Sequence, residues 1–423
     1  MNDPRNIRIS TLANGLRVVS DSMDTVETAS VGVWVNAGAR DESIDINGIS
    51  HLLEHMAFKG TKRRNAYAIA AEIEAVGGHL NAYTSRENTA YYAKVLKEDL
   101  PLAVDLLGDI LQHSVMADEE LERERQVILQ EISQAVDTPD DIVFDHFQET
   151  AFPDQAMGRP VLGRPEVVGA MGRDRVLTYM RERYSAPRLV VSAAGRVDHD
   201  SLVELAEAAF TQLPIQTDTT RDAPSYKGGD FRETRDLEQV HLVLGVEGVS
   251  YKDDDFYAAS ILSALLGGSM SSRLFQEIRE KRGLAYSISS FLSCYTDTGI
   301  FGIYAGTSEG EAAELLPLVL DELDKVKSDV TAEEVSRARA QLKASLLMAL
   351  ESTSSRCEQL AQQMLVFGHP IPTSEIVSKV EAVDETVVMR VAARLLKGAP
   401  TLATMGPIDK VADYRDIAGR LDG

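Results

Sequence analysis

The sequence is poor in cysteine, in clusters of basic residues and in long apolar runs. Its only two cysteines, Cys294 and Cys357, exclude a disulfide framework and the paired CxxC spacing of many zinc sites. No run of Lys and Arg offers a basic surface for nucleic acid, and the formal net charge is −23. No apolar run approaches the roughly 18–20 residues that a membrane span needs, and the first ten residues lack the apolar segment of a secretory signal. We therefore expect a soluble, cytoplasmic protein that binds neither nucleic acid nor membrane.

The rest of the composition is that of a folded protein with more than one core. Hydrophobic residues make up 44% of the chain and charged residues 26%, as in ordinary globular domains. A length of 423 residues allows two or three domains. The least patterned stretch is residues 214–230, PIQTDTTRDAPSYKGGD, where Pro, Gly, Thr and Asp accumulate. We predict that it links a first domain, residues 1–213, to a second domain, residues 231–423.

The two predicted domains show signs of a duplication. After the linker, the order of strand and helix patterns starts again. The segment ADEELERER at Ala117–Arg125 matches TAEEVSRAR at Thr331–Arg339, which lies 214 positions later (331 − 117). Both segments begin helical patterns that are rich in good helix formers. We therefore expect two domains of similar fold.

The strongest chemical signal is the sequence His51-Leu52-Leu53-Glu54-His55. Apolar residues at helical spacing surround it, namely Ile49, Leu52, Leu53 and Met56. We expect Asn47 to cap the start of this helix and Gly60 to end it. His51 and His55 then lie one turn apart on one face, with Glu54 beside them. This is the HxxEH arrangement, in which two imidazoles hold zinc and the glutamate activates a water molecule. The alternative is a pair of surface histidines beside an acidic residue.

A catalytic zinc ion needs a third protein ligand and leaves one position for water. The predicted helix over residues 118–136 offers the carboxylates of Glu120, Glu124 and Glu131. Glu124 and Glu131 are seven residues apart, so that they lie on nearly the same face. Either could bind the metal while the other orients a histidine. The alternative for this helix is a solvated acidic surface.

Three segments together resemble the pitrilysin-type (M16) zinc peptidases, and within them the mitochondrial processing peptidase-like branch. They are HLLEHMAFKGT at His51–Thr61, LNAYTSRENTAYY at Leu80–Tyr92 and ERERQVILQEI at Glu122–Ile132. The resemblance implies that Glu131 completes a site for one Zn²⁺ ion per chain, with Glu124 as the partner of a ligand. It also implies that Glu54 is the catalytic base.

The resemblance further implies which residues hold the substrate. Leu80, Asn81 and Ala82 would form an edge strand on which a peptide pairs as an additional strand. In the second half, GGSMSSRLFQEIREKRGLAYS at Gly267–Ser287 is similar to the family's segment in which an Arg and a Tyr bind the substrate carbonyl. The matching residues are Arg279 and Tyr286, with Arg282 as the less favoured alternative. Both side chains can donate to an oxygen that gains negative charge.

The second copy lacks the proposed metal site. An offset of 214 places Leu265, Gly268, Ser269, Ala338 and Ser345 at the positions that correspond to the five metal-site residues. We therefore expect only the first domain to bind metal.

The fold class that we predict is α+β, with two homologous domains in a processing-peptidase-like metallohydrolase fold. Each domain would have an antiparallel-rich mixed sheet with helices mainly on one face. The expected function is a zinc-dependent endopeptidase that cleaves peptides or unfolded, presequence-like segments. The resemblance implies that two chains pair as a clamshell around a chamber, as a homodimer or as a heterodimer with a related chain. The alternative is a non-catalytic scaffold subunit, which would not need these six residues: His51, Glu54, His55, Glu131, Arg279 and Tyr286.

Overall fold

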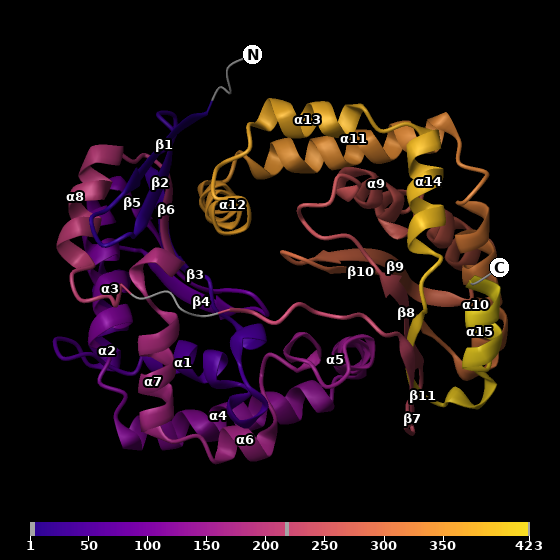
Figure 1. Cartoon of the computed structure of the whole chain (residues 1–423), viewed down its shortest axis with the longest axis horizontal. Helices are drawn as coiled ribbons and strands as arrows, with labels where there is room; N and C mark the ends of the chain where they lie inside the picture. Colours follow the sequence, from indigo (N-terminus) through magenta and orange to yellow (C-terminus); the bar gives the residue numbers. More distant parts are fainter. Residues whose placement is uncertain (1–4, 216–219, 422–423) are drawn as a thin grey trace. The chain divides into compact units, whose positions relative to one another are not determined.

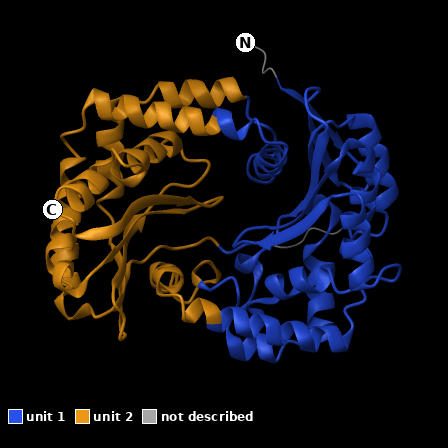
Figure 2. Cartoon of the chain, turned by 180° about the vertical axis from the view of Figure 1, so that it is seen from behind, with its two compact units in different colours: residues 1–133, 159–222, 347–372 blue, residues 134–158, 223–346, 373–423 orange. Residues whose placement is uncertain are grey.

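The structure is a computed structural model of the chain that describes residues 5–215 and 220–421. Residues 216–219 of the predicted linker lie outside the described residues. The chain divides into two compact units, each built from three separate segments (Figure 2). Unit 1 comprises residues 1–133, 159–222 and 347–372, and unit 2 comprises residues 134–158, 223–346 and 373–423. Among the described residues, no helix is both long enough and apolar enough to span a membrane.

Unit 1 is built on a six-stranded sheet with the order β1-β2-β6-β3-β5-β4. Its strands are β1 (Asn6–Thr11), β2 (Arg17–Ser22), β3 (Thr28–Val35), β4 (His79–Thr84), β5 (Thr89–Leu96) and β6 (Leu189–Gly195). Only β2 and β6 pair in parallel, and the other neighbours are antiparallel. Because β4 pairs with β5 alone, one side of its backbone is left at the edge of the sheet.

Most helices of unit 1 cover one face of this sheet. They are α1 (Ile49–Ala57), α2 (Ala66–Ala75), α3 (Leu100–His113), α4 (Asp118–Val136), α6 (Pro165–Gly169), α7 (Arg173–Arg183) and α8 (His199–Ala209). The residues of β3 alternate between the two faces, as expected for a strand. Val33 packs in the core beneath these helices, whereas Trp34 packs on the other face against Cys357 and Ala361 of α12 (Thr353–Val366). Helix α12 therefore closes the second face of the sheet (Figure 1).

Unit 2 has a five-stranded sheet with the order β7-β11-β8-β10-β9. Its strands are β7 (Gly229–Thr234), β8 (Val240–Glu247), β9 (Ala285–Cys294), β10 (Gly299–Thr307) and β11 (Thr401–Gly406). Only β7 and β11 pair in parallel. This order and these directions repeat those of β2-β6-β3-β5-β4 in unit 1, as a duplication requires.

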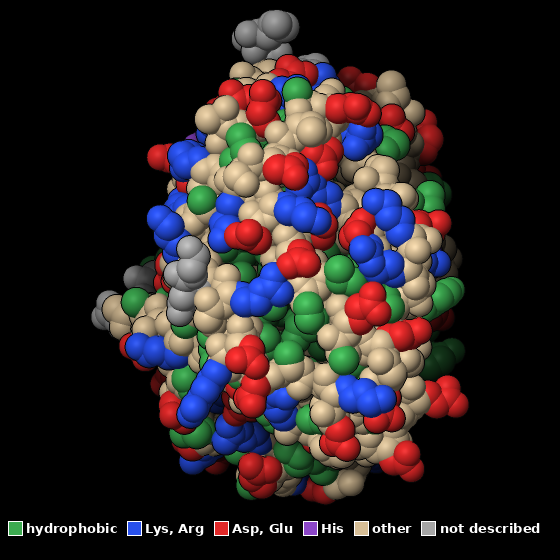
Figure 3. Space-filling view, turned by 90° about the vertical axis from the view of Figure 1, so that its right-hand side faces the viewer, with side chains coloured by type: hydrophobic (Ala, Val, Ile, Leu, Met, Phe, Trp, Pro, Cys, Tyr) green, Lys and Arg blue, Asp and Glu red, His purple; other side chains and the backbone are tan. Residues whose placement is uncertain are grey.

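The helices of unit 2 also gather mainly on one face. They are α9 (Phe256–Gly267), α10 (Glu309–Lys325), α11 (Ala332–Ala349), α13 (Thr373–Glu381), α14 (Glu385–Leu395) and α15 (Tyr414–Leu421), with a π-helical turn at Phe275–Glu280. The opposite face is closed by α5 (Pro139–Ala151), whose Val143 and Phe147 pack against Val243 and Ala403. On the face that Figure 3 shows, acidic and basic side chains are interspersed.

The two units exchange equivalent helices. Helix α5 comes from the first half of the chain but packs on the sheet of unit 2, and α12 comes from the second half but packs on the sheet of unit 1. Their first residues lie 214 positions apart (353 − 139), the same offset as the two matching acidic segments. The predicted α+β class with helices mainly on one face is confirmed. The division at residues 214–230 stays a prediction, and the compact units differ from it by the exchanged segments.

The exchange predicts that a core residue of α12 stabilises unit 1. Leu360 is fully buried against Val19 and Val190 of that sheet, so Leu360→Ala should lower the free energy of unfolding by about 2–5 kcal/mol. Trp34 is the single tryptophan of the chain and also contacts α12. Urea unfolding followed by Trp34 fluorescence therefore reports on unit 1. The control is Leu347→Ala, at a half-exposed position, with an expected change within about 0.5 kcal/mol. Equal changes in the two variants would contradict the packing described for α12.

Candidate metal centre

Helix α1 carries both histidines of the HxxEH motif, and one side of it is buried. Four apolar residues of this side are fully inaccessible, namely Ile49, Leu52, Leu53 and Met56. They lie in the main core of unit 1 and fix the rotation of the helix, so that His51, Glu54 and His55 point away from the core and stay partly accessible. The helix ends at Ala57. Gly60 follows three residues later in the left-handed region, with φ of 119°.

The prediction that Asn47 caps the start of α1 is wrong. Gly48 occupies the N-cap position with φ of 95°, and it has no side chain that could accept a hydrogen bond. The carboxylate of Glu42 takes this role instead, because it accepts from the backbone N–H of Gly48 (2.7 Å) and of Ser50 (2.8 Å). The side-chain amide of Asn47 donates to the same carboxylate at 3.0 Å. Glu42 was missed because capping rules examine the residue next to the helix rather than one six positions earlier.

The structure brings His51, His55 and Glu131 together. The Nε2 atoms of His51 and His55 each lie 3.7 Å from Oε2 of Glu131. One ligand atom from each of the three side chains falls within 4.8 Å of the others, and no other group of this kind occurs among the described residues. Two imidazoles and one carboxylate are a donor set that suits Zn²⁺, with a fourth position left for water. Glu131 is 39% exposed at its side chain, as a ligand open to solvent would be.

Glu124 fills the other role that the spacing argument had left open. Its Oε2 lies 3.0 Å from Nδ1 of His55. Because an ionised carboxylate only accepts, Nδ1 carries the proton and the lone pair of Nε2 faces the site. Oε1 of Glu124 binds the ammonium of Lys59 at 2.7 Å, which balances the charge of this largely buried carboxylate. Sequence reasoning missed Lys59, although it lies four residues after His55 in the quoted motif.

The carboxylate of Glu54 is oriented by the neighbouring edge strand. The hydroxyl of Thr84, the last residue of β4, donates to Oε2 of Glu54 at 2.6 Å. Burial raises the pKa of Glu54, and the hydrogen bond from Thr84 partly offsets this effect. A base with a raised pKa accepts a proton more readily. Thr84 was also missed, although it stands two residues after the predicted substrate strand residues.

Leu80, Asn81 and Ala82 lie on β4, at the edge of the sheet. The backbone N–H of Ser85 donates to the backbone carbonyl of Asn88 across the turn at 2.8 Å, so that the backbone polar groups of Ser85 face β5. Directions alternate along a strand, and Leu80, Ala82 and Thr84 therefore turn their N–H and C=O groups to the open edge. The N–H of Ala82 donates to the side chain of Asn81 at 2.8 Å.

Arg279 and Tyr286 lie together in unit 2. The guanidinium of Arg279 stands over the rings of Phe275 and Tyr286, 4.7 and 4.8 Å from their centroids. Tyr286 is 75% exposed on β9, the edge strand of its sheet. Arg282, the alternative, is ion-paired with Glu277. Arg279 itself is partly accessible, and it forms no ion pair among the described residues.

Unit 2 contains no equivalent of the metal centre among its described residues. The offset of 214 shrinks to 212 between Val35 and Glu247, which end equivalent strands (247 − 35). The equivalences predicted for His51, Glu54 and His55 therefore shift, whereas α4 and α11 still begin 214 positions apart (332 − 118), as predicted for Glu124 and Glu131. The conclusion is unaffected, because α9, the counterpart of α1, contains no His, Asp or Glu. A shallow polar hollow lies there instead, lined in part by Ser269, Ser272 and Glu334.

Family models and known proteins match most of this chain. The family model "Insulinase (Peptidase family M16)" matches residues 17–165, and "Peptidase M16 inactive domain" matches residues 170–342. An uncharacterized zinc protease of Streptomyces coelicolor is 40% identical over 96% of this chain and 91% of its own. A probable mitochondrial-processing peptidase subunit beta of Arabidopsis thaliana is 38% identical over 98% and 81%.

Solved structures share the fold of the whole chain. A protease from Helicobacter pylori superposes with a TM-score of 0.88 at 24% identity, over 95% of this chain and 99% of the other. A chain of Complex III2 from Candida albicans gives the same TM-score at 23% identity, over 98% and 100%. At these identities the likeness concerns the fold alone.

The burial of His51 predicts a pH dependence for the metal-free protein. Burial, with a smaller contribution from His55, lowers the pKa of His51 from its usual 6.5 to about 4. Between these values the unfolded chain binds a proton that the folded chain does not, so that stability falls as the pH falls from 6.5 towards 4. In His51→Gln this slope should be shallower by up to about 1.4 kcal/mol per pH unit. Urea unfolding of both metal-free proteins across this range measures it. Identical slopes would contradict a neutral, buried His51.

Proposed function

The chain belongs to peptidase family M16 and is a metalloprotease, and on this premise we propose that it is a zinc-dependent endopeptidase with one Zn²⁺ ion per chain. His51, His55 and Glu131 would hold the ion. The proposal is supported above all by the convergence of their three ligand atoms within 4.8 Å. The names of relatives as zinc proteases agree with this choice of metal.

The remaining residues of the centre have separate tasks. Bound zinc would polarise a water molecule and the scissile carbonyl. Glu54 would take a proton from that water and pass it to the leaving amine. Thr84 holds the Glu54 carboxylate at 2.6 Å, and Glu124 keeps Nε2 of His55 free to bind through the contact at 3.0 Å.

A substrate peptide would pair with β4 as an added strand. Leu80, Ala82 and Thr84 would supply backbone donors and acceptors, as in other cases of β-augmentation. The hydrogen bond from the N–H of Ala82 to the side chain of Asn81 would break when a peptide pairs with β4. Since Thr84 also contacts Glu54, a peptide on this edge would lie beside the proposed base. Backbone pairing is tolerant of sequence, and we propose peptides or unfolded, presequence-like segments as substrates.

Arg279 and Tyr286 would stabilise the oxygen of the scissile carbonyl as it gains charge. The exposed Tyr286 and the partly accessible Arg279 would complete a metal centre, either within one chain or in a second chain. Several relatives are named as a subunit of the mitochondrial-processing peptidase. We therefore propose that the chain works as a homodimer, or as a heterodimer with a related chain, with the substrate enclosed between chains as in a clamshell. The cytoplasmic location expected from the sequence stays a prediction.

Replacing the proposed base should abolish cleavage and leave the metal in place. Glu54→Gln keeps the three ligands and should lower kcat by about 10²–10⁴-fold, with an unchanged zinc content by elemental analysis. His55→Ala should lose the zinc itself, and a chelator should inactivate the wild type. Cleavage of a fluorogenic peptide measures activity in all three cases, and elemental analysis measures the zinc content of both variants.

The matched control is Glu119→Gln, which changes an exposed glutamate of α4 and should retain full activity. Undiminished turnover in Glu54→Gln would remove this residue from its role. An absence of zinc and of cleavage in the wild type would favour a scaffold subunit instead.

Tyr286→Phe tests the residues of unit 2. Loss of one donor to the developing charge should lower kcat by about 10–10³-fold, with zinc content and KM little changed. Tyr67→Phe, at another strongly exposed tyrosine, is the control. If sites are shared between chains, mixing Tyr286→Phe with Glu54→Gln protein should restore part of the activity. No recovery would show that each site is completed within one chain.

A further inference from the structure

The helix that carries both histidines depends on a distant carboxylate for its start. The first N–H groups of a helix have no partner within the helix and need an acceptor. Gly48 at the N-cap of α1 has no side chain to offer. Glu42 provides both acceptor oxygens, one for the N–H of Gly48 and the other for that of Ser50. It is 3% exposed, so that no solvent could replace it.

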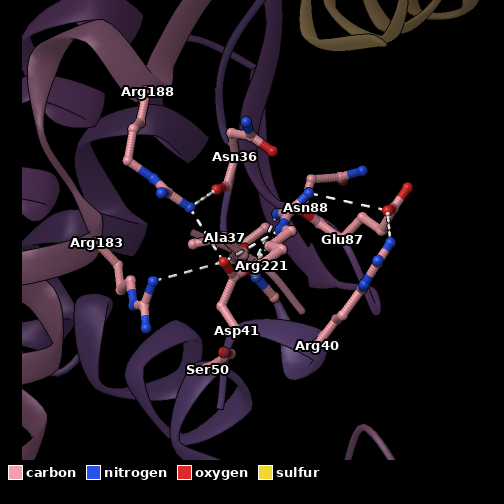
Figure 4. Close-up of polar contacts among 12 residues, drawn as sticks. Asn36, Ala37, Arg40, Asp41, Ser50, Glu87, Asn88, Arg183, Arg188 and Arg221 are labelled. Atoms are coloured by element: carbon pink, nitrogen blue, oxygen red, sulfur yellow. Dashed lines mark hydrogen bonds and ion pairs between the residues drawn. The ribbon is translucent and has the colours of Figure 1, made fainter. Parts of the chain in front are cut away.

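The residue before Glu42 in the chain, Asp41, is bound by a cluster of arginines. Asp41 is buried and faces three guanidinium groups, those of Arg221 at 2.8 Å, Arg188 at 3.2 Å and Arg183 at 3.7 Å (Figure 4). Its Oδ2 also accepts from the backbone N–H of Gly38 at 3.1 Å. Asp41 is thereby fixed on several sides, and with it the backbone that leads to Glu42.

The same cluster reaches the segment that follows the predicted substrate strand. Arg221 donates to the backbone carbonyl of Glu87 at 2.6 Å, and the side chain of Glu87 binds Arg40 at 2.6 Å. Glu87 lies in the turn between β4 and β5, and Arg221 lies in the segment between the two predicted domains. Charged pairs in a buried place are geometrically demanding, because each group left unpaired is costly.

We propose that Glu42 is a positioning residue for the metal ligands, and that the arginine cluster around Asp41 holds it in place. This inference rests on the proposed zinc site. Glu42 fixes where α1 begins, and α1 sets the positions of His51 and His55 against Glu131 on α4. Metal–ligand distances in a formed site lie within about 0.2 Å of their typical values, so that the ligands must be well placed. Residues that orient metal ligands contribute about 10–100-fold to metal affinity. Glu42 would make a contribution of this size by fixing the backbone of α1.

Zinc affinity of Glu42→Gln tests the proposal without measuring cleavage. The amide keeps the size of the side chain but offers one acceptor oxygen in place of two. Burial raises the pKa of Glu42 to about 7, so the measurement is made near pH 8, where the carboxylate is ionised. We expect zinc to bind about tenfold more weakly, by competition with a chromophoric chelator. The absorption bands of the Co²⁺-loaded protein should also shift, because they report ligand geometry.

Two further variants keep the test decisive if Glu42→Gln folds poorly. Glu42→Asp keeps the charge but shortens its reach, and Arg221→Gln loosens Asp41 without touching α1; both should weaken zinc binding severalfold. Glu166→Gln, an exposed acid at the start of α6, is the control and should bind as the wild type does. Unchanged affinity and Co²⁺ spectra in all the Glu42 and Arg221 variants would overturn the inference. Failure of the wild type to bind zinc would overturn the proposed function instead.

Discussion

The candidate metal centre depends on the packing of two helices that are far apart in the sequence. Helix α1 presents two imidazoles, and α4 brings the carboxylate of Glu131 within 3.7 Å of each. Neither helix could hold this geometry alone. Leu121 and Ile128 anchor the opposite side of α4 in the core that also buries the apolar side of α1. Tertiary packing therefore brings side chains from two amphipathic helices into one three-residue cluster. The roles proposed for Glu54 and Glu124 depend on this cluster.

A duplication accounts for the two similar sheets, and among the described residues only unit 1 brings together a group that could hold a metal ion. The strand order and the parallel pair are preserved in both units, whereas the counterpart of α1 in unit 2 has lost all acidic residues and histidines. The fold of the copy does not need those side chains, because its core is formed by the opposite, apolar side of the helix. Unit 2 could thus differ in its polar residues and carry other groups, such as the exposed Tyr286 with Arg279 over its ring.

Sequence reasoning reached the parts of the site that are local. The spacing of His51, Glu54 and His55 follows from helix periodicity, and the packing of α1 agrees with it. Spacing alone did not decide between Glu124 and Glu131, because residues seven apart share a helix face. Resemblance to a family favoured Glu131, and the structure places its carboxylate 3.7 Å from Nε2 of both histidines, whereas Glu124 contacts only Nδ1 of His55. Glu42 and the exchange of α5 and α12 stayed hidden, because their partners are determined by tertiary structure.

The exchanged helices also set the order in which the protein can be completed. As the chain leaves the ribosome, all the strands of the first sheet are present after residue 195, but α12 begins only at residue 353. One apolar face of that sheet, which includes Trp34, must wait uncovered while most of the second half is made. Helix α5 is meanwhile available before the sheet that it covers exists. Nascent chains of this protein therefore offer chaperones a hydrophobic surface until α12 has been made.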